Sequence, residues 1–344
     1  MKEGWVVKKL GEVCEIYQPK TISTNALVEN GKYLVYGANG VIGCYSEYNH
    51  EEPTLLVTCR GATCGTLNIC EPYSYVNGNA MALDNLTDEV DIKYLYYYLL
   101  NRGFEDVITG SAQPQIVRQS LQKVNVTYPD KERQAEIVTV LERVSELIAL
   151  RKEQLAKLDQ LVKSRFIELF EKEEYKKVTV SSVLNTGFWL MPATPDFMVN
   201  GEVPYITSKN IKNRTIDFDN VKYISREAYK SISANRPTQK GDILISMIGT
   251  LGQTAVIQDD REFYGQNLYL LRLNNAIVNT TYFCEFFNSD TAQYELQGKR
   301  NQSTQAYLKA NHVEDLILPL PPMKLQEQFA AFVEQTDKSK LAIQ

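Results

Sequence analysis

The sequence is poor in the residues on which metal sites most often depend. Its 344 residues include only two histidines, His50 and His312, and none of its six cysteines stands in a C-x-x-C pair. Because structural metal sites need clustered nitrogen and sulfur ligands, we expect no metal site and predict reduced, structural thiols. These cysteines are Cys14, Cys44, Cys59, Cys64, Cys70 and Cys284.

Motifs of catalytic and nucleotide sites are missing as well. The chain has no G-x-x-x-x-G-K-[ST], no G-x-G-x-x-G, no H-E-x-x-H and no N-P-P-[YF] string. A Glu-x-Lys at Glu174 to Lys176 falls at a helix end without a preceding strand that carries an aspartate, so it does not indicate a nuclease. The chain by itself is therefore predicted to be non-catalytic.

Long hydrophobic runs are also absent. No run of 18 apolar residues occurs, and the opening MKEGWVVKKLGEV lacks the apolar stretch and small-residue cleavage site of a signal peptide. We therefore expect a cytoplasmic protein. With 44% hydrophobic residues, the chain is long enough for two globular domains with cores of their own.

The net charge of −5 argues against a generally basic nucleic-acid binder. Between Lys209 and Lys240, however, eight basic residues stand against three acidic ones. A local excess of this kind attracts a phosphate backbone. The alternative is an ordinary solvated surface of mixed charge.

The two halves of the chain resemble each other in order. Matched segments stand 170 residues apart near the start, then 188, 190 and 192, so the second copy has gained 18 residues early on. A repeat this long is a domain duplication. The matched positions are Gly31 and Gly201, Leu55 and Ile243, Asn79 and Asn267, Gln115 and Gln305, Pro129 and Pro321, and Gln134 and Gln326.

A long helix is predicted between the copies, from Lys131 to about Glu174, because this stretch has heptad spacing and no glycine or proline. A second helix begins near Met323 but reaches only about half as far. The distal half of the first helix is therefore expected to lack an intramolecular partner, unless the second helix instead folds back on its own module. The apolar positions that we expect to dock partners are Leu141, Ile148, Leu155, Leu158, Val162 and Leu169.

Each copy mixes strands and helices, so the predicted fold class is α+β: two similar globular domains, a long coiled-coil helix and a shortened second helix. The predicted bounds are 1–130, 131–175, 176–322 and 323–344. Strand patterns begin at Leu55, Asp242 and Asn267, and helix patterns cover Ile92–Asn101 and Tyr282–Asn288. The tyrosines of the first of these helices indicate core and surface rather than a base-stacking platform.

Amide-rich loops recur before both long helices, in TGSAQPQIVR and GKRNQSTQAYLK. Glutamine and asparagine offer a donor and an acceptor together, as reading adenine requires, while arginine suits guanine or phosphate. The loop candidates for base or phosphate contacts are Gln113, Gln115, Arg118, Arg300, Gln302, Gln305 and Tyr307.

This arrangement resembles the specificity subunit of type I restriction-modification systems. The resemblance rests on GSAQPQ, then YPDKERQAEI and a heptad helix, and on their echo in QSTQ and LILPLPPMKLQEQ, with P-x4-Q at both helix entrances. GDILISMIGTLGQTAVI from Gly241 is also similar to a strand and turn of that family. The similarity covers almost the whole chain, although the second helix is shorter than the family's.

The resemblance implies a sequence-specific DNA-binding subunit. Each module would be a target recognition domain that reads one half of a bipartite site, and the helices would space the modules and dock two methyltransferase subunits. Those partners would use S-adenosylmethionine, a motor nuclease subunit would use ATP and Mg2+, and this chain would need no cofactor. Self-association through the uncovered distal helix is a further expectation.

Outside the amide loops we expect DNA contacts from seven residues. Arg60 is favoured because it follows a strand and precedes Gly61, which lets the backbone approach a groove closely. The seven are Asn39, Arg60, Lys209, Asn210, Lys212, Asn213 and Arg214. The alternative hypothesis is a two-headed scaffold that assembles proteins without reading DNA.

Overall fold

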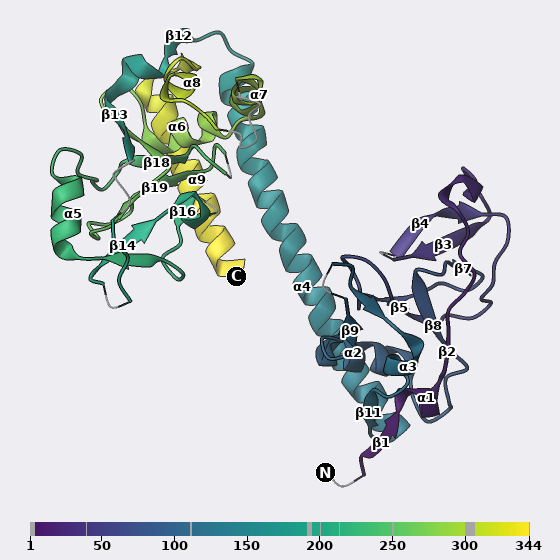
Figure 1. The fold of residues 1–344 in the computed structure, drawn as a ribbon. Coiled ribbons are helices and arrows are strands. Elements are labelled where there is room, and N and C mark those ends of the chain that lie inside the picture. Colours follow the sequence, from purple (N-terminus) through teal and green to yellow (C-terminus); the bar gives the residue numbers. More distant parts are fainter. Residues whose placement is uncertain are drawn as a thin grey trace. The chain divides into compact units, whose positions relative to one another are not determined.

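The structure, a computed structural model, describes residues 4–38, 40–110, 112–190, 195–199, 201–212, 214–249, 251–299 and 307–343 (Figure 1). The chain separates into two compact units, Met1–Leu150 and Arg151–Gln344, and each is described by itself. The boundary falls inside the long helix α4, so each unit includes one part of that helix.

The first unit is built on three small sheets and a hairpin. The four-stranded sheet is antiparallel, in the order β2 (Glu15–Tyr17), β8 (Ala80–Asp84), β5 (Leu55–Thr58) and β6 (Leu67–Ile69). The three-stranded sheet contains β4 (Gly40–Tyr45), β3 (Tyr33–Gly37) and β7 (Tyr75–Val76), with β3 and β7 parallel. The pairs are β1 (Val6–Lys9) with β11 (Asn125–Tyr128), and β9 (Ile108–Thr109) with β10 (Gln115–Ile116).

The helices of the first unit are α1 (Leu10–Val13), the 3-10 turn η1 (Thr24–Ala26), α2 (Ile92–Arg102), α3 (Arg118–Leu121) and α4 (Lys131–Phe166). Helix α2 begins where the Asp91 carboxylate accepts hydrogen bonds from two backbone N–H groups. It ends at Gly103, whose φ is +70°. Tyr94 is buried and stacks on Tyr98, as predicted for a helix whose tyrosines serve packing.

The second unit repeats the three sheets. They are β13 (Leu184–Leu190), β21 (Leu268–Leu273), β18 (Ile243–Ser246) and β19 (Thr254–Val256); β17 (Lys222–Ile224), β14 (Val203–Ile206) and β20 (Tyr264–Gly265); and β12 (Lys176–Thr179) with β22 (Ile317–Leu320). Its helical elements are η2 (Ile167–Glu171), η3 (Val180–Val183), η4 (Ser208–Asn210), α5 (Arg226–Ser233), α6 (Thr280–Phe287), α7 (Asp290–Gly298), α8 (Ala310–Glu314) and α9 (Met323–Ile343).

Strand order confirms that the two units are copies of one α+β module. The order β2-β8-β5-β6 matches β13-β21-β18-β19, and β4-β3-β7 matches β17-β14-β20. Gly31 and Gly201 also play the same part. A Cβ atom would lie 2.8 Å from the Tyr45 nitrogen at the first and 2.6 Å from the Tyr223 Cβ at the second, so the neighbouring strand leaves no room for a side chain.

The residues gained by the second module lie on both sides of β17. Strands β3 and β4 are separated by residues 38–39, whereas β14 and β17 are separated by residues 207–221. That longer connection carries η4 and an added hairpin, β15 (Ile211–Lys212) with β16 (Thr215–Ile216). The following connection to β18 carries α5. The scaffold is therefore conserved between the copies, and the early gain of 18 residues lies in these two connections.

Helix α9 lies antiparallel to the distal part of α4. The Arg151 guanidinium donates to the Ile343 carbonyl oxygen at 2.5 Å, Lys340 lies 2.8 Å from Asp159, and Phe329 contacts Phe166. The prediction that the distal half of α4 lacks a partner was wrong. Because α9 starts beside the distal end of α4 and runs back along it, it covers that half.

Most of the exposed large apolar side chains of α4 lie before residue 151. Five large side chains there are 46–59% exposed. They are Val140, Val144, Leu147, Ile148 and Leu150. Most of the exposed apolar surface of α4 is therefore in this stretch, although Leu161 in the distal half is also 48% exposed.

In each module, the glutamine of the P-x4-Q motif forms a hydrogen-bond network that joins the helix, α4 or α9, to the module. The Gln134 side chain is fully buried; it accepts from the Asp91 N–H and donates to the carbonyls of Glu89 and Pro129, each at 2.8 Å. Gln326 repeats this arrangement. It accepts from the Asn279 N–H at 2.8 Å and donates to the carbonyls of Ile277 at 3.4 Å and Pro321 at 2.8 Å.

Each hydrogen-bond network also anchors a second helix, because Asp91 and Asn279 are the N-cap residues of α2 and α6. Their side chains accept from backbone N–H groups of the first helical turn, while their own N–H groups bind the buried glutamine. One side chain thus holds the starts of two helices together in each module. This is the physical reason for the repeated motif.

Candidate nucleic-acid interface

Three loops of the first module meet where β5 ends. The Ile116 N–H donates to the Cys59 carbonyl at 3.0 Å, and the Gly61 N–H donates to the Pro114 carbonyl at 3.1 Å. The hydroxyl of Thr63 donates to the Ala38 carbonyl at 3.2 Å, which ties in the connection after β3. Residues far apart in the sequence therefore form one loop cluster.

Arg60 and Gln115 are brought together in this cluster. They form an isolated antiparallel bridge, and both side chains are exposed. Directly opposite residues of an antiparallel pair place their side chains on the same face. Gln113 is exposed nearby in sequence, before Pro114. Asn39 lies outside the described residues.

The second module has the same bridge at the same place, between Ile248 and Tyr307. Here the Leu308 N–H donates to the Met247 carbonyl at 2.9 Å, which repeats the bond from Ile116 to Cys59. The structural counterpart of Gln115 is therefore Tyr307, not Gln305 as the sequence alignment predicted. Two residues separate these positions, because the loop gained length before the bridge and not after it. Arg300, Gln302 and Gln305 lie outside the described residues.

Arg118 is not part of the Arg60 and Gln115 pair. It opens α3 and lines a surface depression of about 300 Å³ together with Glu12 and Glu15. A phosphate placed there would meet two carboxylates. The position therefore suits a DNA phosphate less well than the sequence indicated.

Asn210 makes hydrogen bonds within the module, and its DNA contact stays a prediction. Its side chain is 8% exposed; the oxygen accepts from the Thr207 N–H at 2.9 Å, and the amide donates to the Asp217 carbonyl at 3.0 Å. These bonds close the turn from which the β15–β16 hairpin starts. Lys212, on that hairpin, pairs with Asp217 at 2.7 Å and remains largely exposed. Asn213 lies outside the described residues.

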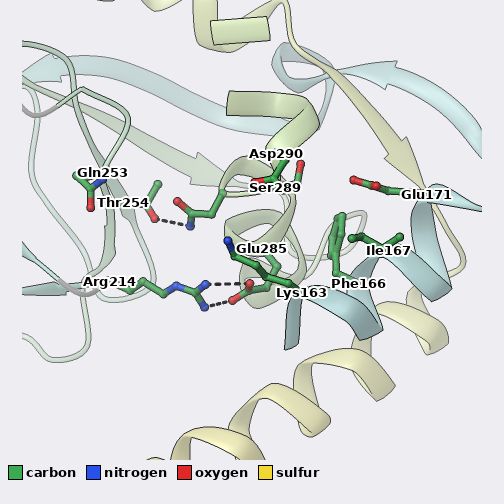
Figure 2. A pocket seen from close by; sticks show the side chains of 11 residues that line it. Lys163, Phe166, Ile167, Glu171, Arg214, Gln253, Thr254, Glu285, Ser289 and Asp290 are labelled. Carbon is green, nitrogen blue, oxygen red and sulfur yellow. Dashed lines mark hydrogen bonds and ion pairs between the residues drawn. The ribbon is translucent and has the colours of Figure 1, made fainter. Parts of the chain in front are cut away.

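The Arg214 side chain is paired with a buried carboxylate. Its guanidinium forms a two-pronged ion pair with the Glu285 carboxylate, which is only 5% exposed, and one of the two bonds measures 3.0 Å. Figure 2 shows the two side chains meeting end to end in a pocket of about 310 Å³ that also receives Lys163 from α4. Arg214 therefore fastens the added hairpin to α6, while its side chain remains 42% exposed and its DNA contact stays a prediction.

The pKa of Glu285 depends both on its burial and on its ion pair with Arg214. Burial raises the pKa of Glu285, and the neighbouring Arg214 guanidinium opposes that shift. Arg214 has a φ of +65°, a backbone region that few residues other than glycine occupy. The hairpin thus has an unusual backbone conformation at Arg214, and the Arg214 guanidinium lies beside a buried carboxylate.

Other cations of the Lys209–Lys240 segment also make contacts within the module. Arg226 pairs with Glu262 at 2.5 Å and Glu202 at 3.6 Å, and Arg236 donates to the Trp189 carbonyl. Within the described part of the chain, Lys209, Lys230 and Lys240 make no ion pair. The local excess of positive charge therefore reduces to a few free lysines, of which only Lys209 is a predicted contact.

The predicted partner-docking positions, five in α4 and Leu169 in η2, divide between two environments. Val162 is 2% exposed and belongs to the core of the second unit, with Leu169 packed against it, while Leu155 and Leu158 are half-buried. Leu141 is half-buried, and Ile148 is 50% exposed. Of the six, Ile148 is thus the one with a largely open side chain.

The described ranges hold no group of three or more His, Cys, Asp or Glu side chains arranged to hold a metal ion. All six cysteines are free, and four of them are buried. No helix in the described part of the chain is both long enough and apolar enough to cross a membrane.

Sequence reasoning missed Glu285, the buried carboxylate that holds the added hairpin. Its position in the apolar stretch TYFCEFF is the one signal that was available, because an acidic residue within a buried helix face needs a partner. The sequence contains no signal for which of the eight nearby cations fills that role.

Comparison with known proteins places this geometry in a family. The model for the type I restriction modification DNA specificity domain matches residues 2–160 and 172–344. The chain is similar to a putative type I restriction enzyme specificity subunit of Haemophilus influenzae, with 23% identity over 351 residues, 95% of this chain and 86% of the relative. It is also 23% identical to the MjaIX specificity subunit of Methanocaldococcus jannaschii over 276 residues, 72% of this chain and 62% of the relative.

Solved structures show the same fold. The type I restriction-modification S subunit from M. genitalium superposes with a TM-score of 0.63 at 16% identity, over 98% of this chain and 91% of the other. A structure from a study of type I system assembly and conformational transition gives 0.54 at 14% identity, over 100% and 92%. With two copies of the module, two helices and a matched model over almost its whole length, the chain belongs to the type I restriction-modification DNA specificity family.

Proposed function

We propose that this chain selects a bipartite DNA target, with each module contacting one half-site. The observation that carries the proposal is the repeated loop pair: the same strand order in both modules presents a cross-strand pair at the same position, with different side chains. Equal scaffolds with unequal exposed residues suit two readers of unequal sequences. The family's role is target recognition, so the chemistry belongs to partner subunits.

The charge of the chain supports this division of labour. A net charge of −5, with Lys212, Arg214 and Arg226 engaged in ion pairs, leaves little positive surface for binding DNA alone. Partner methyltransferase subunits would add cationic surface and S-adenosylmethionine. A motor nuclease subunit would add ATP and Mg2+, and the assembly would act on DNA in the cytoplasm.

Methylation-aware sequencing of host DNA tests the proposal. We expect one split motif, two short specific sequences separated by a spacer of fixed length, to be methylated only when this chain is present. Deleting its coding sequence is the control, and should abolish methylation at every copy of the motif. Methylation that persists after deletion, or binding of the complex to all sequences alike, would instead favour the two-headed scaffold.

We further propose that methyltransferase subunits dock on the exposed apolar stretch of α4. Replacing Leu147, which is 58% exposed, with glutamate should weaken this docking at least about tenfold, because the charge would have to be buried at the interface. Co-purification from cells that express both subunits measures the loss. Leu100→Glu is the matched control, since Leu100 is 54% exposed on α2; an equal effect of both variants would contradict the assignment.

A further inference from the structure

The two cross-strand pairs differ in chemistry although their backbones correspond. Arg60 and Gln115 carry donors and acceptors, whereas Ile248 and Tyr307 present a branched alkyl group and a phenol ring. Neither the Arg60 guanidinium nor the Gln115 amide has a hydrogen-bond partner in the described ranges. By contrast, the guanidinium of Arg102 is held by Asp106 at 2.6 Å, and that of Arg133 by Glu136 at 2.5 Å.

A left-handed glycine follows the first member of each pair. Gly61 has a φ of +90° and Gly249 a φ of +82°, which other residues adopt only with strain. An added Cβ would meet no atom within 4 Å at Gly61, and at Gly249 only the Ser208 hydroxyl at 3.5 Å. Both modules therefore keep the space beside the pair open. Free space next to exposed side chains is what close approach of a second molecule requires.

We infer that these two pairs are specificity-determining residues, and that the modules read bases by different chemistry. This inference rests on the proposed function. The Arg60 guanidinium donates two hydrogen bonds to N7 and O6 of a guanine, and the Gln115 amide donates to N7 and accepts from the N6 amino group of an adenine. Arginine and glutamine side by side thus read a guanine and an adenine in the first half-site.

The second pair reads by apolar contact. Ile248 and the ring of Tyr307 are half-buried, so part of each remains available. A thymine differs from the other bases in the major groove by its C5 methyl group, which alkyl and aromatic side chains contact well. The pair in the second module therefore favours an A·T base pair whose thymine methyl group packs against Ile248 and Tyr307.

The test uses the complete complex with its methyltransferase subunits and a DNA library in which every base pair of both half-sites is varied. Arg60→Ala should reduce discrimination roughly 10- to 100-fold at one G·C pair of the first half-site and leave the second half-site unchanged. Gln115→Ala should act at an A·T pair of the same half-site. Tyr307→Ala should act at one A·T pair of the second half-site only.

Matched variants separate base reading from charge. Arg60→Lys keeps the charge but loses the two-pronged geometry, so general affinity should persist while discrimination at the guanine falls. Tyr307→Phe keeps the ring and should keep discrimination. Gln119→Ala, an exposed glutamine of α3, is the control for Gln115 and should change neither half-site.

The failure of this inference and the failure of the proposed function are distinguishable. If the unmodified complex selects no split sequence, the proposed function fails. If it selects one, but Arg60→Ala lowers affinity equally for all library members, Arg60 is a phosphate contact and the assignment is overturned. Unchanged discrimination in Arg60→Ala, Gln115→Ala and Tyr307→Ala would likewise overturn it.

Discussion

Replacing Arg214 with alanine is expected to lower the free energy of unfolding of the second module by about 3 kcal/mol at neutral pH. The substitution leaves the Glu285 carboxylate, 5% exposed, without its guanidinium partner. A buried charge without compensation is costly because its hydration is not replaced. The β15–β16 hairpin should also loosen, since Arg214 ties it to α6.

This loss should depend on pH. Burial already raises the pKa of Glu285, and removal of Arg214 raises it further, above the value in the unfolded chain. A carboxyl group with a raised pKa binds protons more tightly in the folded state, so its penalty is absent at low pH and grows as pH rises. The deficit of the variant relative to the wild type should therefore be smaller at pH 5 than at pH 8.

Urea unfolding at the two pH values, with hydrogen exchange to localise the effect, measures this. Lys212→Ala is the matched control on the same hairpin, because solvent screens its exposed pair with Asp217 and its loss should be much smaller. Combining Arg214→Ala with Glu285→Gln removes the unpaired charge and should recover part of the stability. A pH-independent loss equal to that of Lys212→Ala would show that the pair does not hold the hairpin.

Replacing Gln326 with leucine is expected to destabilise the second module by roughly 3 kcal/mol. The substitution leaves the Asn279 N–H and the carbonyls of Ile277 and Pro321 without their partner in a place that water does not reach. Gln134→Leu removes the corresponding three bonds in the first module. The two variants should therefore cause similar losses in different parts of the chain.

Hydrogen exchange measured along the sequence checks both variants. Gln326→Leu should increase exchange at the starts of α6 and α9, whereas Gln134→Leu should do so at the starts of α2 and α4. Gln335→Leu, on an exposed position of α9, is the control and should change little. If the exchange pattern of the Gln326 or Gln134 variant matches that of the control, the buried glutamine does not join the starts of the two helices in that module.

Elements whose pattern is local were predicted well from the sequence. Helix α2 was expected over Ile92–Asn101 and covers Ile92–Arg102, and the strand that was expected to begin at Leu55 covers Leu55–Thr58. Helical and extended segments reveal themselves through the spacing of apolar residues along a few turns. The repeat of the module was readable for the same reason, because each copy keeps these local patterns in order.

Contacts between distant residues were not readable. Arg214 and Glu285 are 71 residues apart, and no sequence rule selects one partner among several nearby cations. The alignment placed Gln305 opposite Gln115, but the bridge pairs Ile248 with Tyr307, because strand register depends on where a loop absorbs its extra residues. Arg214, Gln115 and Gln305 are all residues whose types alone made them candidates for DNA contacts.

The sequence by itself determined the duplicated α+β module, the long helix and the repeated P-x4-Q motif, since all three arise from local spacing and from repetition. Only the tertiary structure decided which half of α4 is covered, which cations remain free, and which loop residues lie side by side. The physical reason is that packing against the core of the second module sets the direction of α9. This helix begins at the distal end of α4 and runs back along it. Local sequence patterns specify helices and strands, whereas burial and pairing determine which side chains on their surfaces remain exposed and unpaired.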